Sequence, residues 1–238
     1  MAVTALLIPL LFWAATLALK FSHPALYVEL VQEDNVLELM QCCLYTIAAA
    51  SALRLGLALR EAGLRTAGVL HLLLAALLLL VALEEASWGQ RLFGLETPAF
   101  FERHNRQHEI SLHNLAPVHG RLHKLYLLAG LYGALGWLLS WPWRRQAGAG
   151  RCRLVDLVVP AWPACSGFAV LAAVYYCLVV YPAAVMPYLI ARDQEPAETC
   201  LAWAVGVALW CNGQRLQQYM RLRGQDTPAQ AAAGSAKA

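Results

Sequence analysis

The chain alternates between long apolar blocks and short polar connections. Each block is close to the ~20 residues that an α-helix needs to cross the hydrocarbon core of a bilayer. The pattern predicts an all-α protein, a polytopic membrane helix bundle with about six transmembrane helices. The expected spans are residues 3–19, 36–59, 66–86, 122–141, 166–186 and 197–219. We assign residues 1–226 to a single transmembrane domain, and the Ala/Gly/Ser-rich residues 227–238 to a disordered tail.

The region before the fifth span departs from this simple alternation. Residues 154–190 are long for one span and short for two, and prolines break the segment early (Pro160, Pro163) and late (Pro182, Pro187). We expect a short interfacial or re-entrant piece near 154–162, followed by the span, although two spans stay an alternative.

The connection between the third and fourth spans is the longest polar segment. Within it, Thr97 and Pro98 form a helix-start signal, because a hydroxyl N-cap is followed by proline at the first helical position. This predicts a short interfacial helix in the connection, with Phe100 and Phe101 facing lipid or protein.

Composition supports a membrane protein and excludes several other classes. The 238 residues are 60% hydrophobic and only 14% charged, whereas soluble domains are about 25% charged. A net charge of +3, with the basic residues in short clusters, does not indicate a nucleic-acid-binding surface. Seven cysteines without a Cys-x-x-Cys pair favour neither a zinc knuckle nor a disulfide framework.

The basic clusters predict the orientation of the chain. Cytoplasmic connections are enriched in lysine and arginine, so both termini and the basic connections should be cytoplasmic. Three acidic segments then converge at the extracytoplasmic membrane boundary. The basic positions are Arg54, Arg60, Arg65, Arg144, Arg145, Arg151, Arg153, Arg215, Arg221, Arg223 and Lys237. The acidic segments are Glu29/Glu33/Asp34, Glu84 to Glu109, and Asp193/Glu195/Glu198.

Carboxylates begin the second span and the sixth. Asp34 and Glu38 are four residues apart and share a helical face. Glu38 lies at a membrane boundary, where an uncompensated carboxylate is costly, so we expect it to have a cation, a metal or a proton as partner. The alternative is that both are solvated charges favoured by the helix dipole. We interpret Glu195 and Glu198 as an ordinary helix N-terminus.

Two adjacent carboxylates, Glu84 and Glu85, end the third span. If the helix continues, Glu84, Ser87, Trp88 and Arg91 fall on one face. Close like charges recruit a cation or a proton, which makes this a candidate site. The alternative is an interfacial boundary anchored by the tryptophan.

A histidine-rich stretch follows in the same connection. His104/His108 and Glu109/His113 are both i, i+4 pairs, so each pair places two ligands on one helical face at a spacing used by zinc sites. The alternative is that these histidines donate hydrogen bonds or contact phosphate. Asn114 ends the stretch.

Three motifs in the first half of the chain together resemble a widespread group of bacterial polytopic membrane proteins of uncharacterised activity. They are Gln32-Glu33-Asp34-x-x-x-Glu38, Glu84-Glu85-x-Ser87-Trp88-Gly89-Gln90-Arg91-x-Phe93-Gly94 with Thr97-Pro98, and Leu112-His113-Asn114-Leu115. The resemblance implies a multi-pass protein of the bacterial inner (plasma) membrane. A fainter similarity is to alkaline ceramidase-like membrane hydrolases, although the chain lacks their serine-to-histidine spacing and their paired histidines in the last span.

These patterns leave three functional hypotheses. The first is a membrane-embedded enzyme acting on a lipid or lipid-linked substrate, the second a non-catalytic assembly or partner-binding subunit, and the third a cation or proton pathway. Membrane lipids are the expected partners, with a protein partner or homo-oligomer also open and no nucleic acid. For the enzyme, the catalytic candidates are Glu84, Glu85, His113, Glu38 and Ser87; the substrate-binding candidates are Arg91, Arg106, Trp88, Gln90 and Asn114; the ligands for a divalent metal such as zinc are His108, Glu109 and His113.

Overall fold

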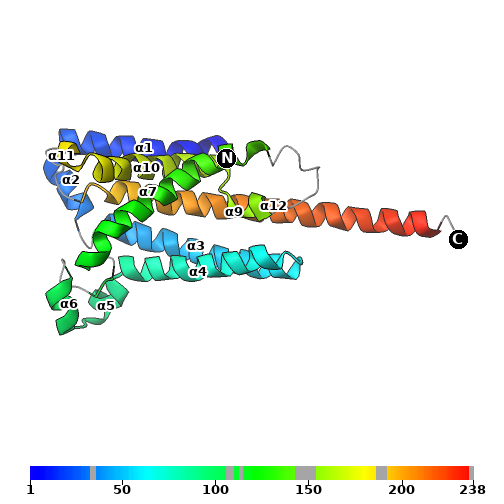
Figure 1. The fold of residues 1–238 in the computed structure, drawn as a ribbon, viewed down its shortest axis with the longest axis horizontal. Coiled ribbons are helices and arrows are strands. Elements are labelled where there is room, and N and C mark those ends of the chain that lie inside the picture. Colours follow the sequence, from blue (N-terminus) through cyan, green and yellow to red (C-terminus); the bar gives the residue numbers. More distant parts are fainter. Residues whose placement is uncertain (33–35, 106–109, 113–114, 143–153, 186–191, 236–238) are drawn as a thin grey trace.

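The structure, a computed structural model, describes residues 1–32, 36–105, 110–112, 115–142, 154–185 and 192–235. Within these ranges the protein is all-α without strands, as predicted (Figure 1). The long helices are α1 (Ala2–Ser22), α3 (Val36–Glu61), α4 (Arg65–Glu85), α7 (Ala116–Leu139), α10 (Cys165–Val180) and α12 (Glu195–Ser235). The short ones are α2 (Pro24–Val31), η1 (Ser87–Gly89), α5 (Gln90–Phe93), α6 (Ala99–His104), α9 (Leu154–Val158), η2 (Trp162–Ala164) and α11 (Pro182–Val185).

Five helical segments in the described part of the chain are long and apolar enough to cross a membrane, which indicates a multi-pass membrane protein. They are Ala2–Ser22, Pro24–Glu61, Arg65–Glu85, Arg121–Leu139 and Leu154–Val180. The expected sixth span, 197–219, is helical within α12. That α12 crosses the bilayer stays a prediction.

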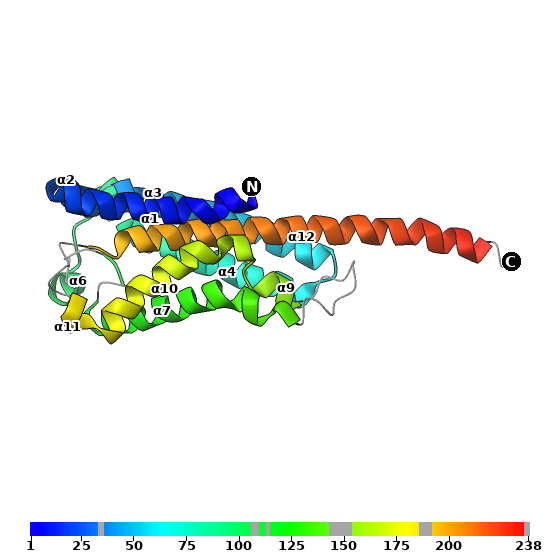
Figure 2. The same ribbon diagram turned by 90° about the horizontal axis from the view of Figure 1, so that it is seen from above.

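The helices are arranged around α12, which lies in the middle of the bundle and extends beyond it (Figures 1 and 2). Helices α3 and α4 form an antiparallel pair on one side of α12, and α7 and α10 pack together on the other. Many core residues are small: Ala48 and Ala52 on α3 and Ala75 on α4 are buried. Small residues allow the close helix contacts by which membrane helices associate.

At one glycine, the side chain of a neighbouring helix takes the place of a Cβ atom. A Cβ atom at Gly133 of α7 would lie 2.0 Å from a ring carbon of Phe168 on α10. The aromatic ring therefore fills the space that any other residue would occupy.

The proline inside α1 is compensated by α12. Because Pro9 lacks an N–H, the carbonyl of Ala5 loses its helical donor. The indole N–H of Trp203 donates to that carbonyl at 3.4 Å. Neighbouring helices satisfy freed backbone groups in this way where no water is available.

The expected short piece before the fifth span is present as α9 and η2, separated from α10 by a kink rather than by a second span. The last carbonyls of such a short helix have no partner within it. They accept side-chain hydrogen bonds instead: Asn212 donates to Leu157 at 2.7 Å, Tyr132 to Val158 at 2.9 Å, and Arg215 to Asp156.

The interfacial helix predicted in the long connection is α6, Ala99–His104. Its N-cap is Pro98 rather than Thr97, and no side chain caps it. The Thr97 hydroxyl accepts a hydrogen bond from Gln90 Nε2 at 2.7 Å.

Candidate functional site

Polar side chains from distant parts of the sequence meet at one end of the bundle, where α1, α4 and α10 end and α3, α7 and α12 begin (Figure 1). At the rim, Lys20 Nζ lies 2.9 Å from Asp193 Oδ1, and these side chains are only 9% and 11% exposed. The Tyr27 hydroxyl donates to the same carboxylate oxygen at 2.6 Å. The three residues join α1 and α2 to the start of α12.

The next layer inward is built on Arg192. Its guanidinium pairs with Glu38 of α3 and, at 2.9 Å, with Glu195. The side-chain N–H groups of Gln41 donate to Glu195 Oε2 at 3.0 Å and to Thr199 Oγ1 at 3.1 Å. Glu38 thus has the partner that its position predicted, a cation. The acidic start of α12 is not an ordinary solvated helix N-terminus, because α3 covers it.

Deeper in the bundle, Glu198 is held by aromatic residues. The buried Tyr175 of α10 donates its hydroxyl proton to the Glu198 carboxylate. Tyr126 of α7 stacks on the Tyr175 ring with centroids 4.8 Å apart, and His123 approaches it edge-on at 5.4 Å. The tyrosine is therefore fixed on both sides, and it orients the carboxylate.

Several polar groups beside this network lack a hydrogen-bond partner. Glu85, at the end of α4, lies in electrostatic range of Glu198 and of the Arg192 layer. Among the described residues, neither its carboxylate nor the hydroxyls of Tyr45 and Tyr126 make a hydrogen bond. Gln41 Oε1, wholly buried, has none either. Buried polar groups are normally satisfied, so the unpaired Gln41 Oε1 is unusual.

The site carries more negative than positive charge. In the described part of the chain it gathers five carboxylates and two cations: Glu38, Glu85, Asp193, Glu195 and Glu198 with Lys20 and Arg192. Buried charge without compensation is costly. Protons, or a cationic or hydrogen-bond-donating ligand, would therefore stabilise this arrangement.

The Glu84 side chain is not part of this polar network and instead contacts the connection that follows α4. Its two oxygens accept hydrogen bonds from Trp88 Nε1 at 2.6 Å and from the Leu112 backbone N–H at 2.7 Å. Helix α4 ends at Glu85, as the third span was expected to, so the condition under which Glu84, Ser87, Trp88 and Arg91 would share one face is not met. Ser87 and Trp88 have φ of 46° and 54°, so the chain leaves the helix there. Glu84 and Glu85 are adjacent in the sequence, but their side chains therefore lie in different environments.

Gln90 continues this connection. Besides donating to Thr97, it accepts the Ile110 backbone N–H at 2.7 Å through Oε1. A further bond within the loop runs from Asn105 Nδ2 to the Ser111 carbonyl at 2.8 Å. Glu84, Trp88 and Gln90 thus fasten the long connection to the end of α4.

The predicted metal ligands cannot be placed. His108, Glu109 and His113 lie outside the described residues, as do Arg106 and Asn114, and the Arg91 side chain does too. Within the described ranges, no three histidine, cysteine or acidic side chains come together as a metal site would require. His104 is described, and its Nδ1 hydrogen-bonds the Phe100 carbonyl at 2.8 Å.

Sequence reasoning missed the aromatic half of the site and much of the α12 contribution. Gln41, Tyr45 and Tyr175 each stand within apolar runs, where a buried amide or hydroxyl needs a partner. That signal was available, but it does not identify the partners: those of Gln41 lie more than 150 residues away, and that of Tyr175 lies on the next long helix.

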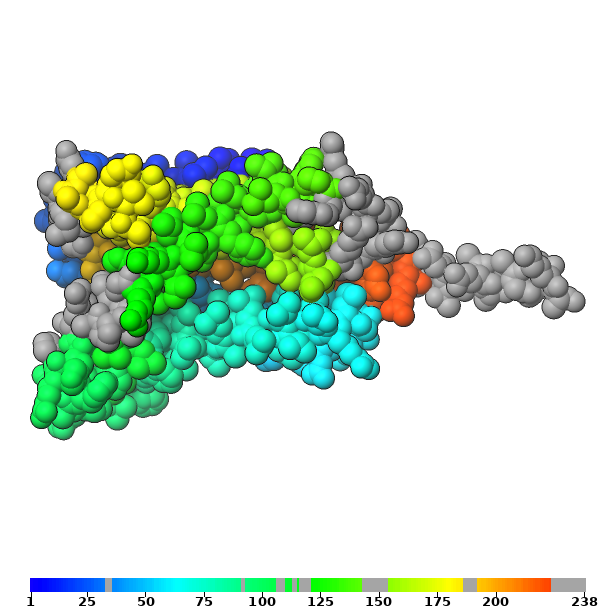
Figure 3. All heavy atoms as spheres, viewed as in Figure 1, coloured from blue at the N-terminus to red at the C-terminus, as the bar shows by residue number. Residues whose placement is uncertain are grey.

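A cavity of about 320 Å³ lies farther from the polar end, between α4 and α7. It is lined by Leu70 and Leu74 on one side and Ala129 and Tyr132 on the other. Figure 3 shows this hollow with α12 visible behind it. At its floor, the buried His71 hydrogen-bonds Asn212 at 3.2 Å.

Fold and site together define a multi-span helical membrane protein with buried charged residues at one end. Comparison with known protein families, with curated proteins and with solved structures finds no match.

Proposed function

We propose that the protein is a membrane-embedded enzyme acting on a lipid or a lipid-linked substrate at the polar end of the bundle. The observation that carries this proposal is a group of polar ends beside the Glu198–Tyr175 pair that make no hydrogen bond to any described residue: the buried Gln41 Oε1 and the ends of Glu85, Tyr45 and Tyr126. A purely structural network would satisfy its own members.

Proton transfer is the chemistry that these groups suit. Glu85 would be the mobile acid or base, because it has neither a cation nor a hydroxyl in direct contact among the described residues. Glu198, oriented by Tyr175, would be the second carboxylate. The free hydroxyls of Tyr45 and Tyr126 would orient the substrate. Such positioned groups typically contribute about 10²–10⁴-fold in rate.

We further propose that this end faces the extracytoplasmic side of a bacterial inner membrane. The support is the distribution of charge along the bundle. Arg60 and Arg65 flank the turn between α3 and α4 at the opposite end, and Arg215 lies far along α12. Positive-inside orientation would then place the acidic end outside.

The non-catalytic alternative, an assembly or partner-binding subunit, also has an observation in its favour. The Lys20–Asp193 and Arg192–Glu38 pairs, with the Tyr27–Asp193 hydrogen bond, join α1, α2 and α3 to the start of α12. At the rim of the site these contacts can have a structural role alone, because they hold the helices together. They give no structural reason for the carboxylate of Glu85, which takes part in none of them.

The experiment compares wild type with Glu85→Gln, Glu198→Gln and the control Glu96→Gln, which changes an exposed carboxylate. Each protein is reconstituted in vesicles made from the total lipid of the expression host, and lipid products are measured by mass spectrometry. We expect turnover by wild type and Glu96→Gln, and a loss of at least about 10²-fold in the other two.

Thermal unfolding separates the two functions. Removing an unpaired, repelled carboxylate should raise the Tm of Glu85→Gln, as often happens when functional sites are neutralised. If Glu85→Gln instead melts lower than wild type and no lipid changes with any protein, the enzyme proposal fails in favour of the structural subunit.

A further inference from the structure

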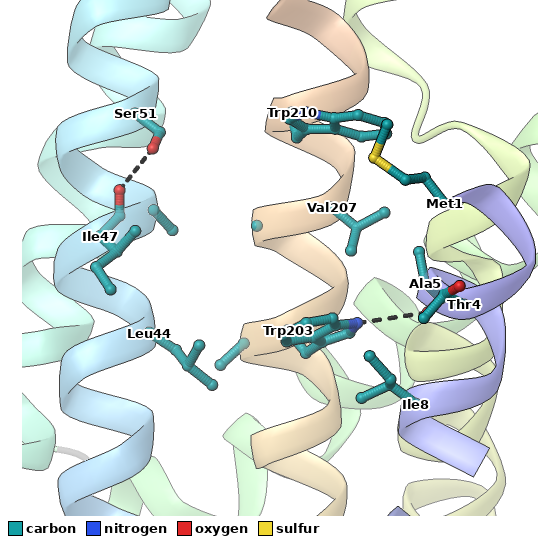
Figure 4. A pocket seen from close by; sticks show the side chains of 13 residues that line it. Met1, Thr4, Ala5, Ile8, Leu44, Ile47, Ser51, Trp203, Val207 and Trp210 are labelled. Atoms are coloured by element: carbon teal, nitrogen blue, oxygen red, sulfur yellow. Dashed lines mark hydrogen bonds between the residues drawn. The ribbon is translucent and has the colours of Figure 1, made fainter. Parts of the chain in front are cut away.

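A groove of about 620 Å³ lies among α1, α3 and α12 (Figure 4). In Figure 4, α12 stands between the other two helices, with Leu44 and Ile47 on the α3 side and Trp203 and Ile8 toward α1. The full lining is Met1, Thr4, Ala5, Ile8, Leu44, Ile47, Ala48, Ser51, Ala202, Trp203, Gly206, Val207 and Trp210. Only Thr4 and Ser51 carry side-chain hydroxyls, so the groove is apolar.

Small residues at the floor and large ones at the wall create the hollow. Ala48 and Ala202 leave space where α3 meets α12, and Gly206 adds no side chain at all. Trp203 and Trp210 are seven residues apart, two helical turns, and therefore lie on the same face of α12. The bond from Trp203 to the Ala5 carbonyl fixes one indole in place.

The surroundings of the groove decide what can occupy it. Helices α1 and α3 are both long and apolar enough to cross a membrane. Exposed side chains beside or within the groove, such as Leu11 at 65% and Ile47 at 64%, make it continuous with the surface that such spans present to hydrocarbon. An occupant entering from that surface must itself be apolar.

The direction of the groove and the place where it ends favour a hydrocarbon chain. The lining of α12 extends from Ala202 to Trp210, about 12 Å along the axis at 1.5 Å per residue. The groove thus runs parallel to the helices, as lipid chains do, and one of its ends lies beside the polar network, where a lipid would place its polar head.

We propose that the groove between α1, α3 and α12 binds the hydrocarbon chain of a membrane lipid. The end at Leu44 and Trp203 lies about one helical turn from Gln41 and Thr199, which hydrogen-bond each other in the polar network. A chain in the groove would direct its polar head toward that network. The proposal that the groove binds a hydrocarbon chain does not depend on the proposed function. The proposal that the polar head of the lipid then reaches Glu85 rests on it.

Gly206 allows a clean test. A Cβ at this position meets open space, so Gly206→Leu would fill the groove without displacing the helices. Gly213, on the same helix, also has open space around it but does not line the groove, which makes Gly213→Leu the matched control. The probe is phosphatidylcholine with a photoreactive group in the acyl chain, in nanodiscs, with cross-linked peptides mapped by mass spectrometry.

We expect cross-links on the groove peptides of α12 in wild type and Gly213→Leu, and a loss of at least about tenfold in Gly206→Leu, equal to ~1.4 kcal/mol of binding. Equal labelling of all three proteins would overturn the proposal. A wild-type dimer that Gly206→Leu converts to monomer would also overturn it, because a second copy would then be the occupant. Loss of labelling without any catalytic effect would preserve the chain site and count against the proposed enzyme.

Discussion

Replacing Lys20 by methionine removes the cation from a buried pair at the rim of the site. The Lys20–Asp193 contact is 2.9 Å, and both side chains are about nine-tenths buried. Losing one partner of a buried pair typically costs about 3–5 kcal/mol, because the other charge is left uncompensated. Asp193 keeps the Tyr27 hydrogen bond at 2.6 Å, however, and a bond to a charged group contributes about 1.5–3 kcal/mol. We therefore expect Lys20→Met to cost about 2–3 kcal/mol.

Asp193→Asn should cost more, about 3–5 kcal/mol. It leaves the Lys20 ammonium without its counter-charge, next to a neutral amide oxygen and to the face of the Tyr27 ring, 5.8 Å from the centroid. The double variant Lys20→Met/Asp193→Asn removes both charges, so it should be less destabilised than the sum of the singles by at least about 2 kcal/mol.

The assay is thermal unfolding in detergent, followed by circular dichroism, for the four proteins of this double-mutant cycle. For a chain of this size, 1 kcal/mol corresponds to about 2–4 °C in Tm. Raising the salt concentration should change the coupling little, because buried pairs are weakly screened. Single effects that add to within about 0.5 kcal/mol would refute the reasoning, since the two charges would then be independent.

Three further substitutions test contacts elsewhere in the fold. Trp203→Phe should lower stability by about 1 kcal/mol, because the Ala5 carbonyl loses its donor, and thermal unfolding measures the loss. Glu84→Gln should speed hydrogen exchange at the Leu112 amide by about tenfold, as a charge-assisted bond becomes a neutral one. Gly133→Ala should destabilise the α7–α10 contact by about 1–3 kcal/mol, measured by Tm, because its Cβ meets an aromatic ring.

Each of these substitutions has a matched control in the chain. Trp210→Phe changes an indole for which the described residues offer no hydrogen bond, Glu96→Gln an exposed carboxylate, and Gly213→Ala a glycine with open space. A control that behaves like its test variant would show that the named contact contributes nothing.

The helical fold was predictable because hydrophobicity along a membrane chain is a local property. Apolar blocks identified α1, α3, α4 and the fourth and fifth spans without any tertiary information. The early prolines likewise predicted the break that separates α9 from α10. The exit from α4 was not predictable in this way, since it depends on left-handed Ser87 and Trp88, residue types that rarely adopt such backbone angles.

The site was predicted in part. Glu38 and Glu85 lie where an unbalanced carboxylate at a membrane boundary suggested a function. For Glu198 the sequence predicts only an ordinary helix start. Its burial comes from Tyr175 and other residues on neighbouring helices, and no local pattern reveals them. Pairwise contacts between helices are set by packing, and hydrophobicity alone does not encode which polar groups meet.

The pairing of early and late segments also sets an order of assembly during synthesis. Glu38 and its partner Arg192 are 154 residues apart. Ribosomes add about 5–20 residues per second, so the first half of the chain would wait roughly 8–30 s in the bilayer before that arginine emerges. During this interval Lys20 and Glu38 lack their final partners, and the early helices have to stay near the membrane surface or be shielded by an insertion factor. The segment that begins α12 therefore supplies the partners of both residues, and a chain interrupted before residue 192 would lack them.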